Sequence, residues 1–201
     1  MLDKYREKAD LILAPLASKI NLEANILTYL SLLFALIAGI FAYFSYEYPV
    51  LLPMVSFLVI MNGLLDALDG KIARMRGTAG KKGDFIDHAI DRFSDVFMMG
   101  GIILSPWVEK VIGIAAITAM LLVSYLGTQA QAVGYKRVYA GILGRADRIV
   151  IIFFALLIQF FVQEKIFHFY FIEWVMIYFI IAGVITIIQR YHAIIKFFEE
   201  K

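Results

Sequence analysis

Residues 50–73 read VLLPMVSFLVIMNGLLDALDGKIA, an apolar run whose last turns carry two aspartates. A helix needs about 20 mostly apolar residues to cross the hydrocarbon core of a bilayer, which is ~30 Å thick. This run is long enough. It therefore predicts a transmembrane helix that ends in acidic side chains, and it points to a membrane fold for the whole chain.

The composition of the chain agrees with a membrane protein. Of its 201 residues 62% are hydrophobic, and the mean hydropathy is +0.80, whereas a soluble domain is about half apolar. The absence of cysteine excludes disulfides, iron–sulfur clusters, thiolate zinc sites and a cysteine nucleophile. A net charge of only +2 argues against a broad nucleic-acid-binding surface. We expect an integral membrane protein with no nucleic-acid partner.

Six apolar runs are candidate membrane spans, and short connections join them. The runs cover residues 26–46, 50–73, 85–104, 111–133, 149–162 and 169–188. No internal repeat is evident, whereas an inverted repeat would favour a transporter. We expect an all-α fold in which residues 1–201 are a single membrane domain and residues 21–201 form its six-helix bundle.

Residues 1–20 precede the first span and are more polar. Their apolar stretch is too short for the core of a signal sequence, and their first residues are mixed in charge. The apolar residues recur at helical spacing: Leu2, Tyr5, Ala9, Ile12 and Leu16. We expect an amphipathic helix lying on the membrane surface. The alternative is a short solubilising leader with no role of its own.

The basic residues predict the orientation in the membrane. With six spans, every lysine and arginine except Lys110 and Lys165 falls on the side that holds both termini. Basic residues are enriched in the cytoplasmic loops of membrane proteins. We therefore expect both termini to be cytoplasmic in the cell membrane.

Acidic residues gather where the second span ends and the third begins. Asp66 and Asp69 are three residues apart, and Asp87 and Asp91 are four apart, so each pair shares a helix face. A rise of ~1.5 Å per residue places Asp66 about 6 Å and Asp91 about 9 Å below the cytoplasmic boundary. Carboxylates at one depth repel unless a cation compensates them. Oxygen ligands suit a hard ion such as Mg²⁺, Mn²⁺ or Ca²⁺, and His88 is the one imidazole nearby.

The residues around these aspartates suit phosphate chemistry. Gly70 and Gly83 leave room for a nucleotide or a metal-bound phosphate, and Ala73 keeps the face of Asp69 open. Arg74 is placed to pair with phosphate or with a carboxylate. Metal ions that bridge phosphates, beside a carboxylate that takes a proton, are the general arrangement for phosphoryl transfer.

Two other interpretations of the acidic residues stay open at this point. The first is a buried network of structural ion pairs, such as Asp66 with Arg74 or Asp95 with Arg92. The second is an ion-transport site, because acidic groups inside a membrane also mark ion pathways.

Residues 66–91 resemble a known family. They match the signature D-x2-D-G-x2-A-R-x8-G-x3-D-x3-D of the CDP-alcohol phosphotransferases at all eight fixed positions. Residues 25–28, Asn-Ile-Leu-Thr, are similar to the N-x-[IL]-T opening of the family's first span. The six-helix layout and the N-terminal surface helix extend the resemblance to the whole chain.

The resemblance implies an enzyme of phospholipid synthesis. In this family a CDP-linked lipid donates its phospholipid moiety to a small polar alcohol, and CMP leaves. By analogy Asp66, Asp69 and Asp87 ligate a divalent metal, Mg²⁺ or Mn²⁺, with two ions expected. Asp91 is then a further ligand to the second ion and the general base for the acceptor hydroxyl. The residues implied for the CDP site are Asp66, Asp69, Gly70, Ala73, Arg74 and Gly83. The family also implies a homodimer whose active site opens to the cytoplasm and to lipid.

The connection between the fourth and fifth spans is basic. It holds four cations: Lys136, Arg137, Arg145 and Arg148. Arg145 and Arg148 are three residues apart and can face one site. Cations near the metal site suit an acceptor that itself carries phosphate. The alternative is that they are positive-inside residues that contact lipid headgroups.

Residues 124–132 and 144–148 resemble the branch of the family that uses inositol phosphate. That branch has S-Y-x-x-A-R-A-E in the first segment and an R-x-x-R-like element in the second, which is present here. Gln129 and Gln131 stand where the branch has arginine and glutamate. This pattern favours the archaeal archaetidylinositol phosphate synthases, whose donor is an ether lipid. The alternatives are another acceptor, such as serine, glycerol phosphate or inositol, and a divalent-cation transporter that uses the same aspartates.

Overall fold

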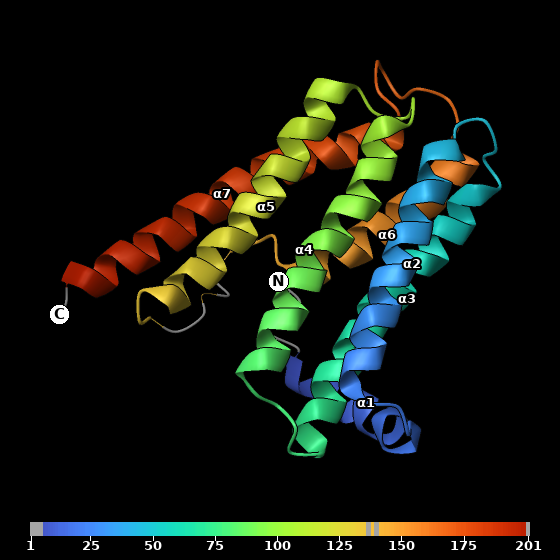
Figure 1. Ribbon diagram of the computed structural model, residues 1–201. Coiled ribbons are helices and arrows are strands. Elements are labelled where there is room, and N and C mark those ends of the chain that lie inside the picture. The colour runs from blue at the N-terminus through green and yellow to red at the C-terminus, as the bar shows by residue number, and fades with distance from the viewer. Residues whose placement is uncertain (1–5, 136–137, 139–140, 200–201) are drawn as a thin grey trace.

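The computed structural model describes the backbone of residues 6–135, 138 and 141–199, and the side chains of this set from residue 11 onward. Its helices are α1 Arg6–Lys19, α2 Ala24–Phe44, α3 Leu51–Met75, α4 Lys81–Leu104, α5 Lys110–Ala132, α6 Arg145–Phe161 and α7 Phe171–Glu199 (Figure 1). The described residues contain no strand beyond one isolated bridge, between Ile166 and Phe169. The prediction of an all-helical fold is confirmed.

Four of these helices are long and apolar enough to cross a membrane. They are α2, α3, α5 and α7. The other two expected spans differ from them for separate reasons. Helix α6 has only 17 residues, and the first half of α4 carries the acidic residues of the signature. Six spans therefore stay a prediction, whereas several apolar helices place the chain among integral membrane proteins.

Helix α2 is the centre of one half of the bundle. It packs against both α3 and α4, while α3 and α4 touch each other little. A methyl group added at Gly101 would overlap the backbone carbonyl of Gly39, so α2 and α4 approach backbone to backbone. Since α2 separates them over most of their length, α3 and α4 face a common space where their acidic ends lie.

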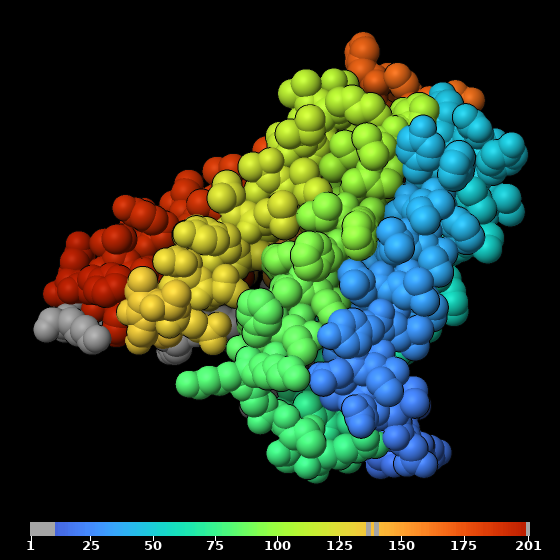
Figure 2. All heavy atoms as spheres, viewed as in Figure 1, coloured from blue at the N-terminus to red at the C-terminus, as the bar shows by residue number. Residues whose placement is uncertain are grey.

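The other half of the bundle is built on α7. Helix α5 packs along α7, α6 lies against both α3 and α7, and α4 meets α5. Figure 1 shows α5 and α7 leaning away from α2 and α3 toward the end where α3 finishes and α4 begins. At that end the surface is indented between α4 and α5 (Figure 2).

Helix α1 lies across the same end of the bundle and packs on α3. Its Ala17 is buried in a small cluster with Leu68 and Ile72, whereas Leu11 and Ile12 are about three-quarters exposed. Of the apolar residues that predicted this helix, Leu2 and Tyr5 and the side chain of Ala9 lie outside the described residues. Its position on a membrane surface therefore stays a prediction.

Candidate active site

A cavity of about 1840 Å³ opens at the end of the bundle where α5 and α7 lean away. All seven helices contribute to its lining. The predicted site residues that line it are Asp66, Asp69, Gly70, Ala73, Arg74, Gly83, Asp87, Asp91, Arg145 and Arg148. The remaining two, Lys136 and Arg137, lie outside the described residues. The fold thus brings together every predicted site residue that the structure describes.

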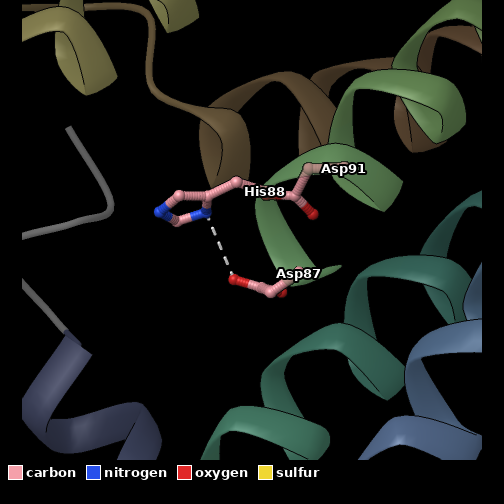
Figure 3. Close-up of side chains that lie close together, drawn as sticks. All are labelled: Asp87, His88 and Asp91. Atoms are coloured by element: carbon pink, nitrogen blue, oxygen red, sulfur yellow. Dashed lines mark ion pairs between the residues drawn. The ribbon is translucent and has the colours of Figure 1, made fainter. Parts of the chain in front are cut away.

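The carboxylates of α3 and α4 converge inside this cavity. One oxygen from each of Asp66, Asp69 and Asp87 lies within 4.8 Å of the others. A second group on α4 is equally compact, since ligand atoms of Asp87, His88 and Asp91 meet the same limit. Figure 3 shows the imidazole of His88 beside Asp87, with 3.4 Å between Nδ1 and Oδ2. Asp69 and Asp91 are both buried.

Asp69 is held in place by a hydroxyl group. Thr28 Oγ1 on α2 donates a hydrogen bond to Asp69 Oδ2 across 2.6 Å, in a buried position. This threonine closes the N-x-[IL]-T segment, to which the sequence analysis assigned no role. The segment therefore acts from the neighbouring helix by fixing one carboxylate of the acidic group.

Arg145 is the cation at the centre of the acidic residues. Its Nη1 lies 2.5 Å from Asp66 Oδ2 on α3 and 2.8 Å from Asp91 Oδ1 on α4. Its Nε is 3.8 Å from Asp95 Oδ1, and Nη2 donates to Asn62 Oδ1 across 3.4 Å. A guanidinium group from α6 therefore joins the two helices that carry the signature.

The start of α6 fixes the position of Arg145, which is the first residue of that helix. The amide of Gly144 donates to Asp147 Oδ2 across 3.0 Å and so caps the helix. The two preceding amides, of Ile142 and Leu143, both donate to Thr186 Oγ1 on α7. The backbone that carries Arg145 is thus tied to α7 as well as to its own helix.

Arg148 lies behind Arg145 and is only 2% exposed. Its Nη2 forms an ion pair with Asp95 Oδ2 across 2.8 Å. Its Nη1 donates to the carbonyl of Met120, across 3.1 Å, and to Ser124 Oγ, across 3.3 Å. The arginine that was predicted to bind acceptor phosphate therefore has its guanidinium group held between α4 and α5.

Asp95 is a buried residue that the sequence analysis assigned no catalytic role. It is 3% exposed and lies near three guanidinium groups, those of Arg92, Arg145 and Arg148. The pairing of Asp95 with Arg92 that one alternative proposed is present, at 3.6 Å. The sequence contained a signal for this position of Asp95, because Asp95 follows Asp91 by four residues and so shares its helix face.

Arg190 on α7 is a second residue that sequence reasoning missed. It lines the cavity and is buried, and its Nη1 donates to the carbonyl of Val123. A methyl group at Gly127 would lie 2.7 Å from that nitrogen. The glycine therefore leaves the space that lets Arg190 reach the cavity from α7.

Comparisons with known proteins identify the family of the chain. Residues 21–192 match the sequence profile of the family described as CDP-alcohol phosphatidyltransferase. The chain belongs to this family. The resemblance found in residues 66–91 is thereby confirmed, and the protein is a transferase of substituted phosphate groups.

Two archaeal relatives cover most of the chain. The chain is 33% identical to an archaetidylinositol phosphate synthase of Pyrococcus horikoshii over 77% of its own length and 81% of that protein. It is 30% identical to the protein of the same name from Methanothermobacter thermautotrophicus, over 94% and 92% of the two chains.

A solved structure supports the fold. The phosphatidylinositol phosphate synthase of Mycobacterium tuberculosis, determined with CDP-DAG bound, superposes with a TM-score of 0.73. The sequences are 23% identical, and the superposition covers 91% of this chain and 93% of the other. The same protein determined with manganese and citrate gives a TM-score of 0.73 at 22% identity, over 90% and 88% of the two chains.

Proposed function

We propose that this enzyme transfers the phospholipid moiety of a CDP-linked lipid to an inositol phosphate and releases CMP. The observation that carries the proposal is the convergence of Asp66, Asp69 and Asp87 in a cavity that also holds Arg145. The acidic group suits a nucleotide diphosphate with its metal, and the guanidinium group suits a phosphorylated acceptor. The names of the two archaeal relatives support inositol phosphate as the acceptor and an ether lipid as the donor.

The acidic residues fit a divalent cation. Their donors are carboxylate oxygens on two helices, close enough to share an ion, and those of Asp69 and Asp91 are buried. Hard cations prefer such donors. Asp66, Asp69, Asp87 and Asp91 are the residues that would hold two ions, Mg²⁺ or Mn²⁺. When bound, such a cation neutralises phosphate charge and makes CMP a better leaving group. The relative that was solved with manganese supports this choice of metal.

The surroundings of the carboxylates suit the cytidine diphosphate group. We assign this group to Asp66 and Asp69 together with Gly70, Ala73, Arg74 and Gly83, all of which line the cavity. A methyl group at Gly83 would meet nothing within 4 Å, so open space adjoins this position. Arg74 lies in the last turn of α3, and we assign it to supply a positive charge for the diphosphate.

Asp91 is the base that we propose for the reaction. The acceptor hydroxyl oxygen bonds to the phosphorus of the lipid phosphate while the bond from that phosphorus to the CMP oxygen breaks. The hydroxyl proton passes to the Asp91 carboxylate. Because Asp91 is 5% exposed, little water competes with the acceptor for this position.

The acceptor phosphate is assigned to the basic residues Lys136, Arg137, Arg145 and Arg148, of which Arg148 lies behind Arg145. Arg145 lines the cavity and lies directly beside Asp91, so a phosphate that contacts it brings the acceptor close to the base. Arg148 supports this position through its ion pair with Asp95. A neutral acceptor such as serine has no group that requires these cations.

The arrangement in the membrane is part of the proposal. We propose that residues 1–201 form one membrane domain, that α2 to α7 all cross the bilayer, and that α1 lies on the cytoplasmic surface. Lys110 begins α5 and Lys165 lies between α6 and α7, both at the end opposite the cavity. The bias of the other basic residues therefore supports cytoplasmic termini and a cytoplasmic active site. The family supports a homodimer.

The test is release of CMP by the purified protein. The protein is incubated with CDP-archaeol or CDP-diacylglycerol, Mg²⁺ and one candidate alcohol at a time. We expect release with inositol 1-phosphate alone. Release with serine or glycerol phosphate instead would overturn the acceptor assignment and keep the reaction. If no alcohol gives release although the CDP-lipid binds, the proposed function fails, and cation uptake into proteoliposomes would test the transporter.

A further inference from the structure

We propose that Arg145 exchanges between the metal carboxylates and the acceptor phosphate, and that this exchange selects phosphorylated acceptors. The inference rests on the proposed function and deepens it. It assigns one side chain to two positions: a pairing with Asp66 and Asp91 before the metal binds, and a pairing with the acceptor's phosphate afterwards.

The first position is set by the contacts of Nη1. This one nitrogen pairs with Asp66 on α3 and with Asp91 on α4, and both residues belong to the proposed ligand set. A guanidinium group and a divalent cation carry the same sign of charge, and their repulsion is strong at a few ångströms where water is scarce. A metal ion bound by these two carboxylates therefore excludes Arg145 from its present position. Conversely, Arg145 in that position excludes the metal ion.

The second position follows from how the side chain is anchored. The backbone of Arg145 is fixed at the start of α6, and its Nε lies 3.8 Å from Asp95 Oδ1 in the present position. Its side chain is 15% exposed and lines the cavity. The guanidinium group can therefore turn away from Asp66 and Asp91 into the cavity while its stem remains beside Asp95.

The preference for a phosphorylated acceptor arises from the anion that compensates the displaced guanidinium charge of Arg145. A guanidinium group that leaves two carboxylates needs another anion, and a phosphate accepts two parallel hydrogen bonds from it. Inositol 1-phosphate supplies that anion, whereas serine or free inositol does not. Metal loading therefore prepares the cavity for a phosphorylated acceptor, and a neutral alcohol leaves Arg145 free to compete with the metal.

Thermodynamic linkage makes the exchange measurable without turnover. If metal binding favours the position of Arg145 that binds phosphate, the acceptor must raise the affinity for metal by the same factor. We therefore expect inositol 1-phosphate to tighten Mn²⁺ binding to the wild-type protein by at least about fivefold, the usual lower limit of such coupling. Free inositol should leave Mn²⁺ binding unchanged.

The experiment measures Mn²⁺ affinity by electron paramagnetic resonance of the free ion, on detergent-purified protein without CDP-lipid. Arg145→Gln should bind Mn²⁺ at least about fivefold more tightly than wild type, because the competing cation is gone. In that variant, inositol 1-phosphate should no longer change the Mn²⁺ affinity.

Arg92→Gln is the matched control. Arg92 also lies beside Asp91, with 3.5 Å between its Nη2 and Asp91 Oδ2. Its charge is removed by the same type of substitution, arginine to glutamine. It differs in that its ion pairs with Asp91 and Asp95 stay on α4 and do not reach across to α3. This variant should tighten Mn²⁺ binding less than Arg145→Gln, and it should keep the response to inositol 1-phosphate.

Three results would overturn the exchange. They are Mn²⁺ binding in Arg145→Gln that equals or falls below wild type, an equal tightening in Arg92→Gln, and a wild-type affinity that ignores inositol 1-phosphate. If Arg145→Gln fails to fold, Arg145→Lys replaces it, because lysine keeps the positive charge on a shorter side chain. Inositol 1-phosphate must then change the Mn²⁺ affinity of Arg145→Lys less than that of wild type. If the wild-type protein binds Mn²⁺ and releases CMP, but inositol 1-phosphate does not change its Mn²⁺ affinity, the exchange is contradicted and the proposed function stands. Failure to bind Mn²⁺ or to release CMP would contradict the proposed function.

Discussion

The two ends of the bundle differ in how their buried polar groups are paired. At the end away from the cavity, Trp107 is 3% exposed, and its Nε1 donates to Ser45 Oγ across 3.0 Å. Its ring meets those of Tyr46 and Tyr170 edge to face, with centroids 4.8 and 4.9 Å away. At the cavity end, charged side chains from different helices pair with one another around open space.

The helix termini show the same contrast. At the closed end, Lys110 Nζ donates to the carbonyls of Ile103 and Ser105, and Glu173 accepts from the amides of Glu109 and Tyr170. Each charge there stabilises backbone groups of short connections. At the cavity end Arg145 faces carboxylates of two other helices, and we expect a metal or a phosphate to replace these partners. Changes at the closed end are therefore expected to affect stability alone, whereas changes at the cavity end can affect activity as well.

The largest expected effect is on activity, from Asp91→Asn. The amide keeps the shape of the carboxylate but cannot take a proton or ligate metal well. We expect CMP release to fall by at least about 10²-fold, the usual minimum for loss of a general base. Thermal unfolding in detergent should stay close to wild type.

Asp84→Asn is the matched control for Asp91→Asn. Asp84 lies on the same helix, at a variable position of the signature, and its side chain is 62% exposed. It should therefore retain CMP release. Survival of activity in Asp91→Asn, or an equal loss in both variants, would refute the role of Asp91 as base.

The next effect is on stability and concerns Asp95→Asn. The change leaves the buried guanidinium group of Arg148 without its carboxylate, and a buried charge that loses its partner costs about 3–5 kcal/mol. Adding Arg148→Met removes the uncompensated charge and should recover most of that free energy of unfolding. Chemical or thermal unfolding of both variants in detergent measures this. A single variant as stable as wild type, or a double variant no more stable than the single one, would contradict the pairing.

The helices of the fold could largely be predicted from apolar runs. The predicted spans 26–46 and 111–133 lie within two residues of α2 and α5. The predictions were too short for α4, which begins at Lys81, and for α7, which continues to Glu199. Hydropathy identifies only the part of a helix that suits lipid. Where the sequence becomes polar but stays helix-forming, the backbone continues its hydrogen bonds and the helix extends.

The site could be predicted only where its residues are close in sequence. The pairs of aspartates were found because helical spacing places residues three and four apart on one face. The contact of Arg145 with Asp66 joins residues far apart in the chain, so it depends on how α6 packs against α3. The same spacing correctly put Arg145 and Arg148 on one side of α6. Helical spacing could not show that Arg145 pairs with Asp91 and that Arg148 pairs with Asp95.

A smaller effect is expected at the closed end, from Trp107→Phe. The change removes the hydrogen bond to Ser45 and part of a buried ring, which together should lower the free energy of unfolding by about 1–3 kcal/mol. CMP release per folded molecule should not change, because this end does not face the cavity. Thermal unfolding and the CMP assay on the same preparation test both statements. A loss of specific activity without a loss of stability would contradict the division between the two ends.

The smallest effect is expected from Tyr46→Phe, also at the closed end. The hydroxyls of Tyr46 and Tyr170 are 3.1 Å apart, and this hydrogen bond raises the pKa of Tyr170 from 10.0 to about 12. The raised pKa means that folding favours the protonated hydroxyl. The stabilisation is therefore complete below pH 10 and is lost as the pH rises through about 12. Both hydroxyls are exposed to water, so we expect only about 0.5 kcal/mol. Unfolding of wild type and variant should differ at pH 8 and converge above about pH 12. A difference that persists above that pH would show that packing, rather than the hydroxyl pair, joins the loops at this end.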